Sequence, residues 1–155
     1  MTTFTINGKT VTVDLRAGTT LLDYLREQGF FSVKYGSDKG ETGSDSVLVD
    51  GKSMNASLML IHTLNGKNVE TVESFAHGRE VHPLQDTFIE EGAIQCGYCT
   101  PGMILAIESL ARENELLSEE DVKDVLAGVY CRCTGYVKPV KAALLYIATK
   151  NTKRR

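Results

Sequence analysis

Four cysteines are the residues of this chain whose type and spacing could do chemistry. They form two close pairs, Cys96-x2-Cys99 and Cys131-x-Cys133, separated by 31 residues. The first 95 residues contain no cysteine, whereas a disulfide framework normally spreads its cysteines along the chain. In a reducing compartment, clustered thiols are typical of metal binding. The spacing therefore predicts a metal centre held by all four thiolates.

Two kinds of metal centre would suit four thiolates. A structural zinc ion binds four of them in a tetrahedron, and a [2Fe-2S] cluster binds four across its two irons. Zinc sites usually have two or more residues between the members of a ligand pair, and Cys131-x-Cys133 is tighter than that. The spacing favours the iron-sulfur cluster but leaves zinc, or four ordinary thiols, as alternatives.

Both cysteine pairs come directly before a segment that we expect to be helical. Thr100 and Pro101 open the first helix, and residues 134–138 lead into the second. A helix start offers free backbone N–H groups and the positive end of its dipole, which would stabilise an anionic cluster. Gly97 and Gly135 would let the backbone approach sulfur, where N–H donors raise the reduction potential.

The first half of the chain has the pattern of a small α+β unit. The expected strands alternate polar and apolar residues and cover residues 3–6, 10–15, 46–49 and 69–75. Asn7-Gly8 between the first two indicates a hairpin. An amphipathic helix capped by Thr19 or Thr20 should follow, with apolar positions Leu21, Leu22, Leu25 and Phe30.

From Pro83 onward the apolar period becomes helical. The expected helical segments include residues 84–89, 103–111, 122–126 and 137–149. Ser118 and Asp121 resemble a capping box, with Asp where Glu or Gln is usual, and Gly128 would end that helix. We place the boundary near residues 77–83, which predicts domains of residues 1–78 and 79–155.

Composition and charge exclude several classes of function. The 155 residues are 42% hydrophobic and 24% charged, and the net charge of -3 comes without a long run of one sign. This argues against a nucleic-acid or anionic-membrane partner. No segment reaches the roughly 20 apolar residues of a membrane span, and the N-terminus lacks the features of a secretory signal. We therefore expect a cytoplasmic protein.

No set of residues outside the cysteines has the pattern of a catalytic centre. The chain has no Ser/His/Asp set or paired-carboxylate motif that would support one, and His62, His77 and His82 stand at no recognised ligand spacing. We assign the histidines no role, and we expect the substrate chemistry to lie on another chain.

Longer motifs resemble a known family. QCGYCTPGMI (residues 95–104) and CRCTGY (residues 131–136) are similar to the C-terminal cluster signature of the [2Fe-2S] subunits of the xanthine dehydrogenase and aldehyde oxidase family. YGSDKGETGSDSVLVDGK and NASLML resemble the N-terminal cluster loop of the same proteins, so the similarity covers essentially the whole chain. It implies a ferredoxin-like β-grasp domain followed by a four-helix domain that binds one [2Fe-2S] cluster.

The resemblance also implies a role in electron transfer. A large partner subunit would bind a molybdopterin cofactor and hydroxylate a carbon centre, and this chain would take the electrons one at a time; related complexes also contain a flavin-binding subunit. Gln95 matches a family position that contacts the pterin. Cys133 matches the cluster ligand closest to it.

The chain departs from its family in the first half. Family members carry there a plant-type cluster with the pattern C-x4-C-x2-C and a fourth cysteine, and the corresponding residues here are Ser37, Thr42, Asp45 and Ser57. Glycines remain at positions 36, 40 and 43, so we interpret the loop as a lost cluster site. The alternative is that its oxygen atoms bind a hard cation together with Asp38 or Glu41.

Two other functions remain open. One is a structural subunit whose cluster or zinc ion only joins the helices while the chain bridges two larger subunits. The other is a free-standing ferredoxin-like carrier, although Tyr98, Met103 and Tyr136 beside the cysteines indicate a covered site.

Overall fold

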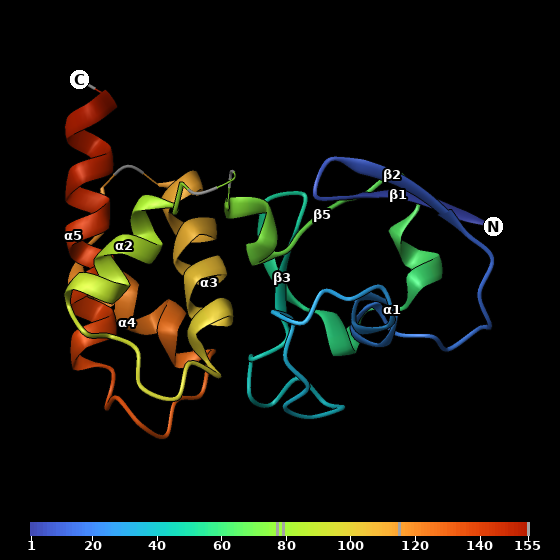
Figure 1. Ribbon diagram of the computed structural model, residues 1–155, viewed down its shortest axis with the longest axis horizontal. Helices are drawn as coiled ribbons and strands as arrows, with labels where there is room; N and C mark the ends of the chain where they lie inside the picture. The colour runs from blue at the N-terminus through green and yellow to red at the C-terminus, as the bar shows by residue number, and fades with distance from the viewer. Residues whose placement is uncertain (77, 79, 115, 155) are drawn as a thin grey trace.

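The computed structural model describes residues 1–76, 78, 80–114 and 116–154. The described part of the chain is α+β, as the sequence predicts, with a five-stranded sheet and one helix followed by four further helices (Figure 1). Residues 77 and 79, which belong to the expected boundary segment, lie outside the described residues; residue 77 is His77, one of the three histidines to which the sequence assigned no role.

The sheet consists of two hairpins joined by a central strand. The strands are β1 (Thr2–Ile6), β2 (Lys9–Val13), β3 (Ser46–Val49), β4 (Lys52–Asn55) and β5 (Asn68–Glu70), in the order β2-β1-β5-β3-β4. The predicted turn of the first hairpin is confirmed, because Asn7 and Gly8 have φ values of 49° and 78°. Strand β5 is parallel to β1 and antiparallel to β3, so it closes the sheet between the two hairpins.

Helix α1 (Leu21–Glu27) covers the sheet of the first half. Thr20 caps it, and its side-chain oxygen accepts the backbone N–H of Asp23 at 3.1 Å. The sequence placed Phe30 on this helix, but Gly29 has a φ of 89° and turns the chain first. Phe30 packs against the first core from beyond the helix.

The strand expected over residues 69–75 is wrong in its second half. Only Asn68–Glu70 pairs with the sheet, and Val72–Phe75 forms a 3-10 helix. A contact between residues distant in the sequence explains the change. The side-chain amide of Asn7 accepts the backbone N–H of Thr71 at 2.8 Å and donates to the Thr71 hydroxyl at 2.9 Å. Two further 3-10 helices, Ala56–Leu58 and Ile61–Leu64, lead from β4 toward β5.

The second half contains α2 (Pro83–Glu90), α3 (Thr100–Glu113), α4 (Glu119–Ala127) and α5 (Val137–Arg154). The capping box before α4 is confirmed, since Ser118 and Asp121 bond each other's backbone N–H at 2.7 and 3.2 Å. His82 caps α2 through a bond from the backbone N–H of Leu84 at 3.3 Å, a structural role that the sequence did not indicate. Within the described residues, no helix is long and apolar enough to cross a membrane.

Two hydrophobic cores meet at the sheet. The first lies between the sheet and α1, and the second lies among the four later helices. Leu48 of β3 and Phe75 belong to the helical core although they come from the first half. Helix α3 packs on β3 and β4 (Figure 1), so the helical half is held against the sheet.

A partly buried ionic network strengthens the contact between the halves. Arg112 of α3 binds both carboxylate oxygens of Glu70 on β5, at 2.9 and 3.1 Å, and bonds Glu108 at 3.1 Å. Glu108 also accepts bonds from Tyr146 and Lys150 of α5. Burial raises the pKa of Glu108, but these hydrogen bonds outweigh it, so the pKa lies below its ordinary value. The network fixes α3 relative to both the sheet and α5.

Candidate metal centre

The fold brings all four cysteines to one end of the helical half, at the helix starts that the sequence predicted. Cys99 is the N-terminal cap of α3, and its carbonyl accepts the backbone N–H of Met103 at 3.0 Å. Cys131 and Cys133 lie in the loop between α4 and α5. Two cysteine motifs with 31 residues between them in the sequence are therefore neighbours in the structure.

The thiols are arranged as two pairs, each joining one cysteine from each motif. Cys99 and Cys131 form a buried pair, each 8% exposed, with their thiols in hydrogen-bonding contact. Cys96 and Cys133 form an exposed pair, again with their thiols in contact. The site thus has an inner side toward the helical core and an outer side toward solvent.

The two buried thiols differ in acidity. Burial, a hydrogen bond with Cys131 and the nearby sulfur charges together raise the pKa of Cys99 to about 12. Burial also raises the pKa of Cys131, but bonds from the Thr134 hydroxyl at 3.1 Å and from the backbone N–H groups of Thr134 and Cys133 lower it below its ordinary value. The contact between the two thiols thus raises the pKa of Cys99 and lowers the pKa of Cys131. A metal bound to both must release the proton on Cys99.

The outer pair also contains a thiol whose pKa depends on its partner. A hydrogen bond with Cys96 raises the pKa of Cys133. Gly97 and Gly135 have φ values of 81° and 62°, so the backbone beside each motif adopts a conformation that glycine favours. Backbone N–H groups of Cys133 and Thr134 bond the Cys131 sulfur, and that of Cys96 bonds the Cys133 sulfur.

The two thiol pairs are compatible with a binuclear cluster. Each iron of a [2Fe-2S] cluster takes two of the four thiolates, and the thiols here form two contacting pairs. Tetrahedral zinc would need all four sulfurs at about 2.3 Å from one point. Among residues 1–76, 78, 80–114 and 116–154, no three His, Cys, Asp or Glu side chains are grouped around one point.

The outer side of the site also carries the predicted contact residue. Gln95 is exposed and adjoins Cys96 of the exposed pair. Of the covering residues that the sequence singled out, Met103 is fully buried, Tyr136 is half-buried and Tyr98 is 47% exposed. The Tyr98 hydroxyl donates to the carbonyl of Tyr35, which ties the cysteine motif to the first half. Gln95 and Cys133 both lie where a partner chain could reach them.

The loop of residues 36–45 keeps its folded shape without cysteines. Ser37 accepts the backbone N–H groups of Lys39 and Glu41, each at 3.1 Å. Asp45 accepts the backbone N–H of Ser57 at 2.7 Å, so these two positions are neighbours. Their remaining atoms, Asp45 Oδ1 and Ser57 Oγ, are buried with no protein partner among the described residues.

The structure provides few ligands for a hard cation in this loop. Asp38 is exposed and accepts the Tyr35 hydroxyl at 2.7 Å, and Glu41 is exposed as well. The loop thus supplies a single buried carboxylate, which is fewer charged ligands than calcium sites normally use.

Sequence reasoning missed a direct contact between the two loops. The carbonyl of Thr42 accepts the backbone N–H of Tyr130 at 2.8 Å. A Cβ atom at Gly43 would lie 2.0 Å from the carbonyl oxygen of Gly128, and one at Gly102 would lie 2.6 Å from that of Gly43. Only glycine permits this approach. The sequence signal for this close approach was Gly102, because glycine is unfavourable inside a helix and its presence there indicates a neighbouring backbone.

Comparisons with known proteins agree with this geometry. A family model described as a [2Fe-2S] binding domain matches residues 71–144. The chain is 42% identical to the xanthine dehydrogenase iron-sulfur-binding subunit of Escherichia coli O157:H7, over 90% of this chain and 89% of that protein. It is 38% identical to the nicotinate dehydrogenase small FeS subunit of Eubacterium barkeri, over 91% and 90%.

The fold is also similar to solved structures. Quinoline 2-oxidoreductase from Pseudomonas putida 86 superposes with a TM-score of 0.91 at 36% identity, and the match covers 98% of this chain and 95% of that one. The likeness thus extends over both halves and includes the loop that lacks cysteines.

Proposed function

This chain belongs to the family of iron-sulfur-binding small subunits of xanthine dehydrogenase and related dehydrogenases, and from that premise we propose that it transfers electrons within a molybdopterin-dependent hydroxylase. The observation that carries the proposal is the set of four thiols, paired across two helix starts, with one pair buried and one exposed. When bound there, a [2Fe-2S] cluster supplies a centre that accepts one electron at a time. The chain is the non-catalytic subunit of an oxidoreductase.

The protein residues would share the work of holding that cluster. Cys99 and Cys131 would anchor its inner side in the helical core, and Cys96 and Cys133 would hold its outer side. Electrons would enter from the outer side, where Gln95 would contact the pterin of the large subunit and Cys133 would be the ligand nearest to it. The dipole of α3 and the N–H groups at the Cys131 sulfur would stabilise the negative charge of the bound cluster.

The surface around the outer pair supports a covering partner. Apolar side chains next to the two motifs are exposed, namely Ile94, Tyr98, Tyr130 and Val137. Exposed apolar groups that rim a functional site are typical of a protein interface, and a large molybdopterin-binding subunit would bury them. This favours a complex over a free-standing carrier. A flavin-binding subunit belongs to the same proposal.

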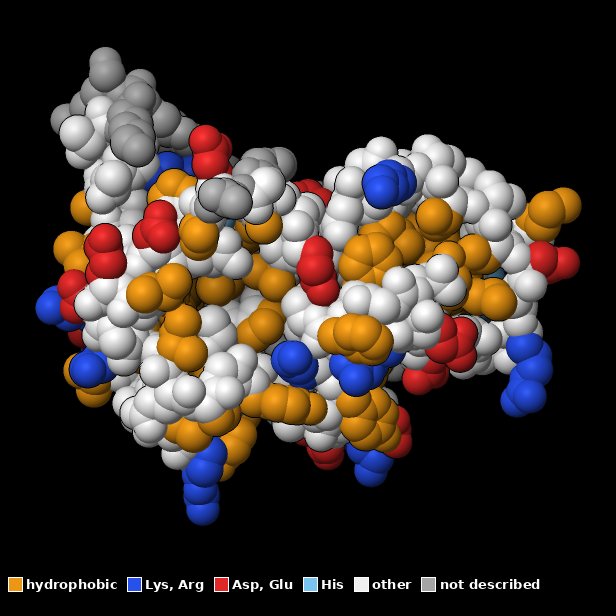
Figure 2. All heavy atoms as spheres, in the orientation of Figure 1, with side chains coloured by type: hydrophobic (Ala, Val, Ile, Leu, Met, Phe, Trp, Pro, Cys, Tyr) orange, Lys and Arg blue, Asp and Glu red, His pale blue; other side chains and the backbone are white. Residues whose placement is uncertain are grey.

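Several finer features complete the proposal. Residues 1–78 would form a β-grasp ferredoxin-like domain without a cluster, and residues 79–155 a four-helix [2Fe-2S] domain. The protein would work in the cytoplasm, where thiols stay reduced. Nucleic acid and membranes are not expected partners, because Lys and Arg side chains are interspersed with Asp and Glu over the face in Figure 2 and the net charge is -3.

The contact made by Gln95 can be tested in the copurified complex. Gln95→Ala should leave the visible spectrum of this chain unchanged but lower turnover by roughly tenfold, which corresponds to one lost hydrogen bond of about 1.4 kcal/mol. Gln28→Ala is the matched control, because Gln28 is also exposed but lies at the end of α1. Equal turnover of wild type and Gln95→Ala would remove the proposed contact.

The same preparation separates electron transfer from a purely structural role. Dithionite should bleach the visible absorption, and air should restore it. Absorption that dithionite cannot change would support the structural subunit instead.

A further inference from the structure

Tyr136 adopts a backbone conformation that a bulky residue rarely has. Its φ is 67°, in the left-handed region, directly after Gly135 with a φ of 62°. Glycine adopts this conformation at no steric cost, but for tyrosine it costs on the order of 1–3 kcal/mol. Such strain persists only where surrounding contacts hold it in place. The contacts that hold Tyr136 lead directly to the cysteines.

The side chain of Tyr136 forms hydrogen bonds with the loop between α4 and α5. Its hydroxyl accepts the backbone N–H of Cys131 at 2.7 Å and donates to the carbonyl of Val129 at 3.1 Å. Its own backbone N–H donates to the hydroxyl of Thr134 at 3.2 Å, and that hydroxyl lies 3.1 Å from the Cys131 sulfur. The hydroxyl and the backbone N–H of Tyr136 thus both form hydrogen bonds within residues 129–134.

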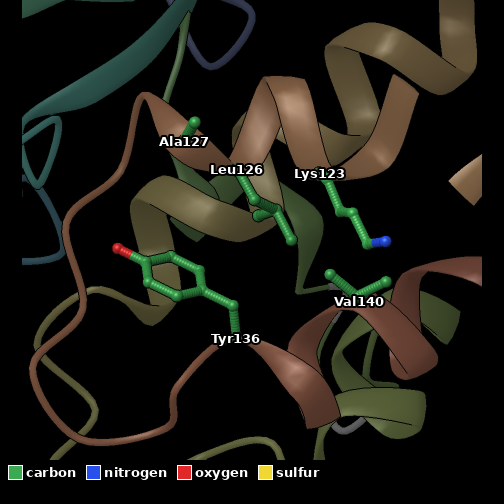
Figure 3. A pocket seen from close by; sticks show the side chains of 5 residues that line it. All are labelled: Lys123, Leu126, Ala127, Tyr136 and Val140. Carbon is green, nitrogen blue, oxygen red and sulfur yellow. The ribbon is translucent and has the colours of Figure 1, made fainter. Parts of the chain in front are cut away.

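The ring itself lies at a cleft of about 370 Å³ between α4 and α5. Figure 3 shows the hydroxyl pointing away from the other lining side chains, Lys123, Leu126, Ala127 and Val140, toward the loop that joins the two helices. The ring thus lines the cleft while the hydroxyl bonds the loop. Removing the hydroxyl alone would leave the contacts of the ring in place.

These bonds decide which donors face the Cys131 sulfur. The sulfur receives the backbone N–H groups of Cys133 and Thr134 and lies next to the Thr134 hydroxyl. The N–H of Cys131 itself is directed to Tyr136 instead. Donors to ligand sulfur stabilise the reduced cluster and raise its potential. A side chain that binds one of these N–H groups would remove a donor from the cluster and so would lower its potential.

We propose that Tyr136 is a positioning residue for the metal centre, whose hydroxyl fixes the Cys131–Cys133 loop and keeps the Cys131 N–H away from cluster sulfur. The proposal rests on the proposed [2Fe-2S] function and adds a residue that tunes it. The competing explanation is that Tyr136 only fills space between α4 and α5. The two differ in what happens when the hydroxyl alone is removed.

Tyr136→Phe keeps the ring and removes only the hydroxyl. Tyr130→Phe is the matched control, because Tyr130 also adjoins Cys131 but is 54% exposed, and its hydroxyl accepts from the side chain of Arg132 at 3.1 Å. Both variants are made in the full chain carrying its reconstituted cluster. The midpoint potential is measured by dithionite titration followed by electron paramagnetic resonance, and cluster stability by the rate of bleaching with an iron chelator.

We expect Tyr136→Phe to have a higher midpoint potential than wild type and to bleach about tenfold faster, as the loss of a buried hydrogen bond requires. Tyr130→Phe should match wild type in both measurements. A Tyr136→Phe chain that equals wild type in potential and bleaching overturns the proposal, and so does an equal shift in both variants. A wild-type chain that assembles no cluster contradicts the proposed function instead.

A second variant keeps the test decisive if Tyr136→Phe loses its helical circular dichroism. Thr134→Val removes the acceptor of the Tyr136 backbone N–H and should also speed bleaching. An unchanged bleaching rate in Thr134→Val would then overturn the proposal.

Discussion

Cys99→Ala is expected to abolish the cluster and to lower the melting temperature of the protein sharply. Cys99 caps α3 and pairs with Cys131 from the loop before α5, so metal bound by both joins segments that are distant in the sequence. Metal binding contributes roughly 10 kcal/mol in small structural sites. Loss of even about 3 kcal/mol would lower the melting temperature of a chain this size by roughly 6–12 °C. Iron content, visible absorption and thermal melts followed by circular dichroism measure both effects.

The matched control for this prediction lies in the loop without cysteines. Ser37 accepts two backbone N–H groups of its own loop, and its side chain has no bond to the helical half among the described residues. Ser37→Ala should therefore keep the full iron content and leave the melting of the helices unchanged. If Ser37→Ala lost iron to the same extent as Cys99→Ala, the assignment of a single site would be wrong.

A second large effect is expected when cysteines are placed in that loop. The combined variant Ser37→Cys, Thr42→Cys, Asp45→Cys and Ser57→Cys should raise iron from about two to about four atoms per chain, because four thiolates complete a second [2Fe-2S] site. The turns are already formed, since Gly40 and Gly43 have φ values of 68° and 64°. The pair at positions 45 and 57 is already in contact. The substitution also removes a buried carboxylate oxygen that has no protein partner.

The control for the combined variant keeps Asp45 and changes only the other three positions. With three thiolates it should hold clearly less additional iron, and resonance spectra should show a complete second signal only for the fourfold variant. Iron that remains at about two atoms per chain in the fourfold variant would show that the loop cannot accommodate a cluster. In that case the interpretation of the loop as a lost site fails.

The added cluster would also test the proposed path of electrons. Family members place a cluster in this loop between the helical-domain cluster and a flavin. The proposed path therefore lacks its middle relay in this chain, and transfer to a flavin subunit should be slow. Rapid-mixing spectra of the complex should show faster flavin reduction in the fourfold variant than in wild type.

Local patterns in the sequence predicted most of the secondary structure. The turn at Asn7-Gly8, the cap at Thr20 and the capping box at Ser118 are each determined by neighbours within a few residues. The errors occurred where distant residues decide the structure. Alternation in residues 72–75 was typical of a strand, but Asn7, at the end of the neighbouring strand β1, bonds Thr71 and the chain turns there.

The candidate site shows the same division. The position of each cysteine pair before a helix could be predicted, because helix starts have local sequence signals. The pairing of Cys99 with Cys131, and of Cys96 with Cys133, depends on how α3 and the later loop pack, which no local pattern encodes. The hydroxyl of Tyr136 was missed for a related reason. An aromatic residue in an apolar setting gives no sign of where its polar end bonds.

Metal analysis of the purified full chain tests the central claim most directly. Iron, acid-labile sulfide and zinc are measured on the same sample, together with the visible spectrum. One site of four thiolates predicts about two irons and about two sulfides per chain, with visible absorption that dithionite bleaches. One zinc per chain without visible absorption, or four irons in the wild-type chain, would contradict the assignment of a single [2Fe-2S] cluster to Cys96, Cys99, Cys131 and Cys133.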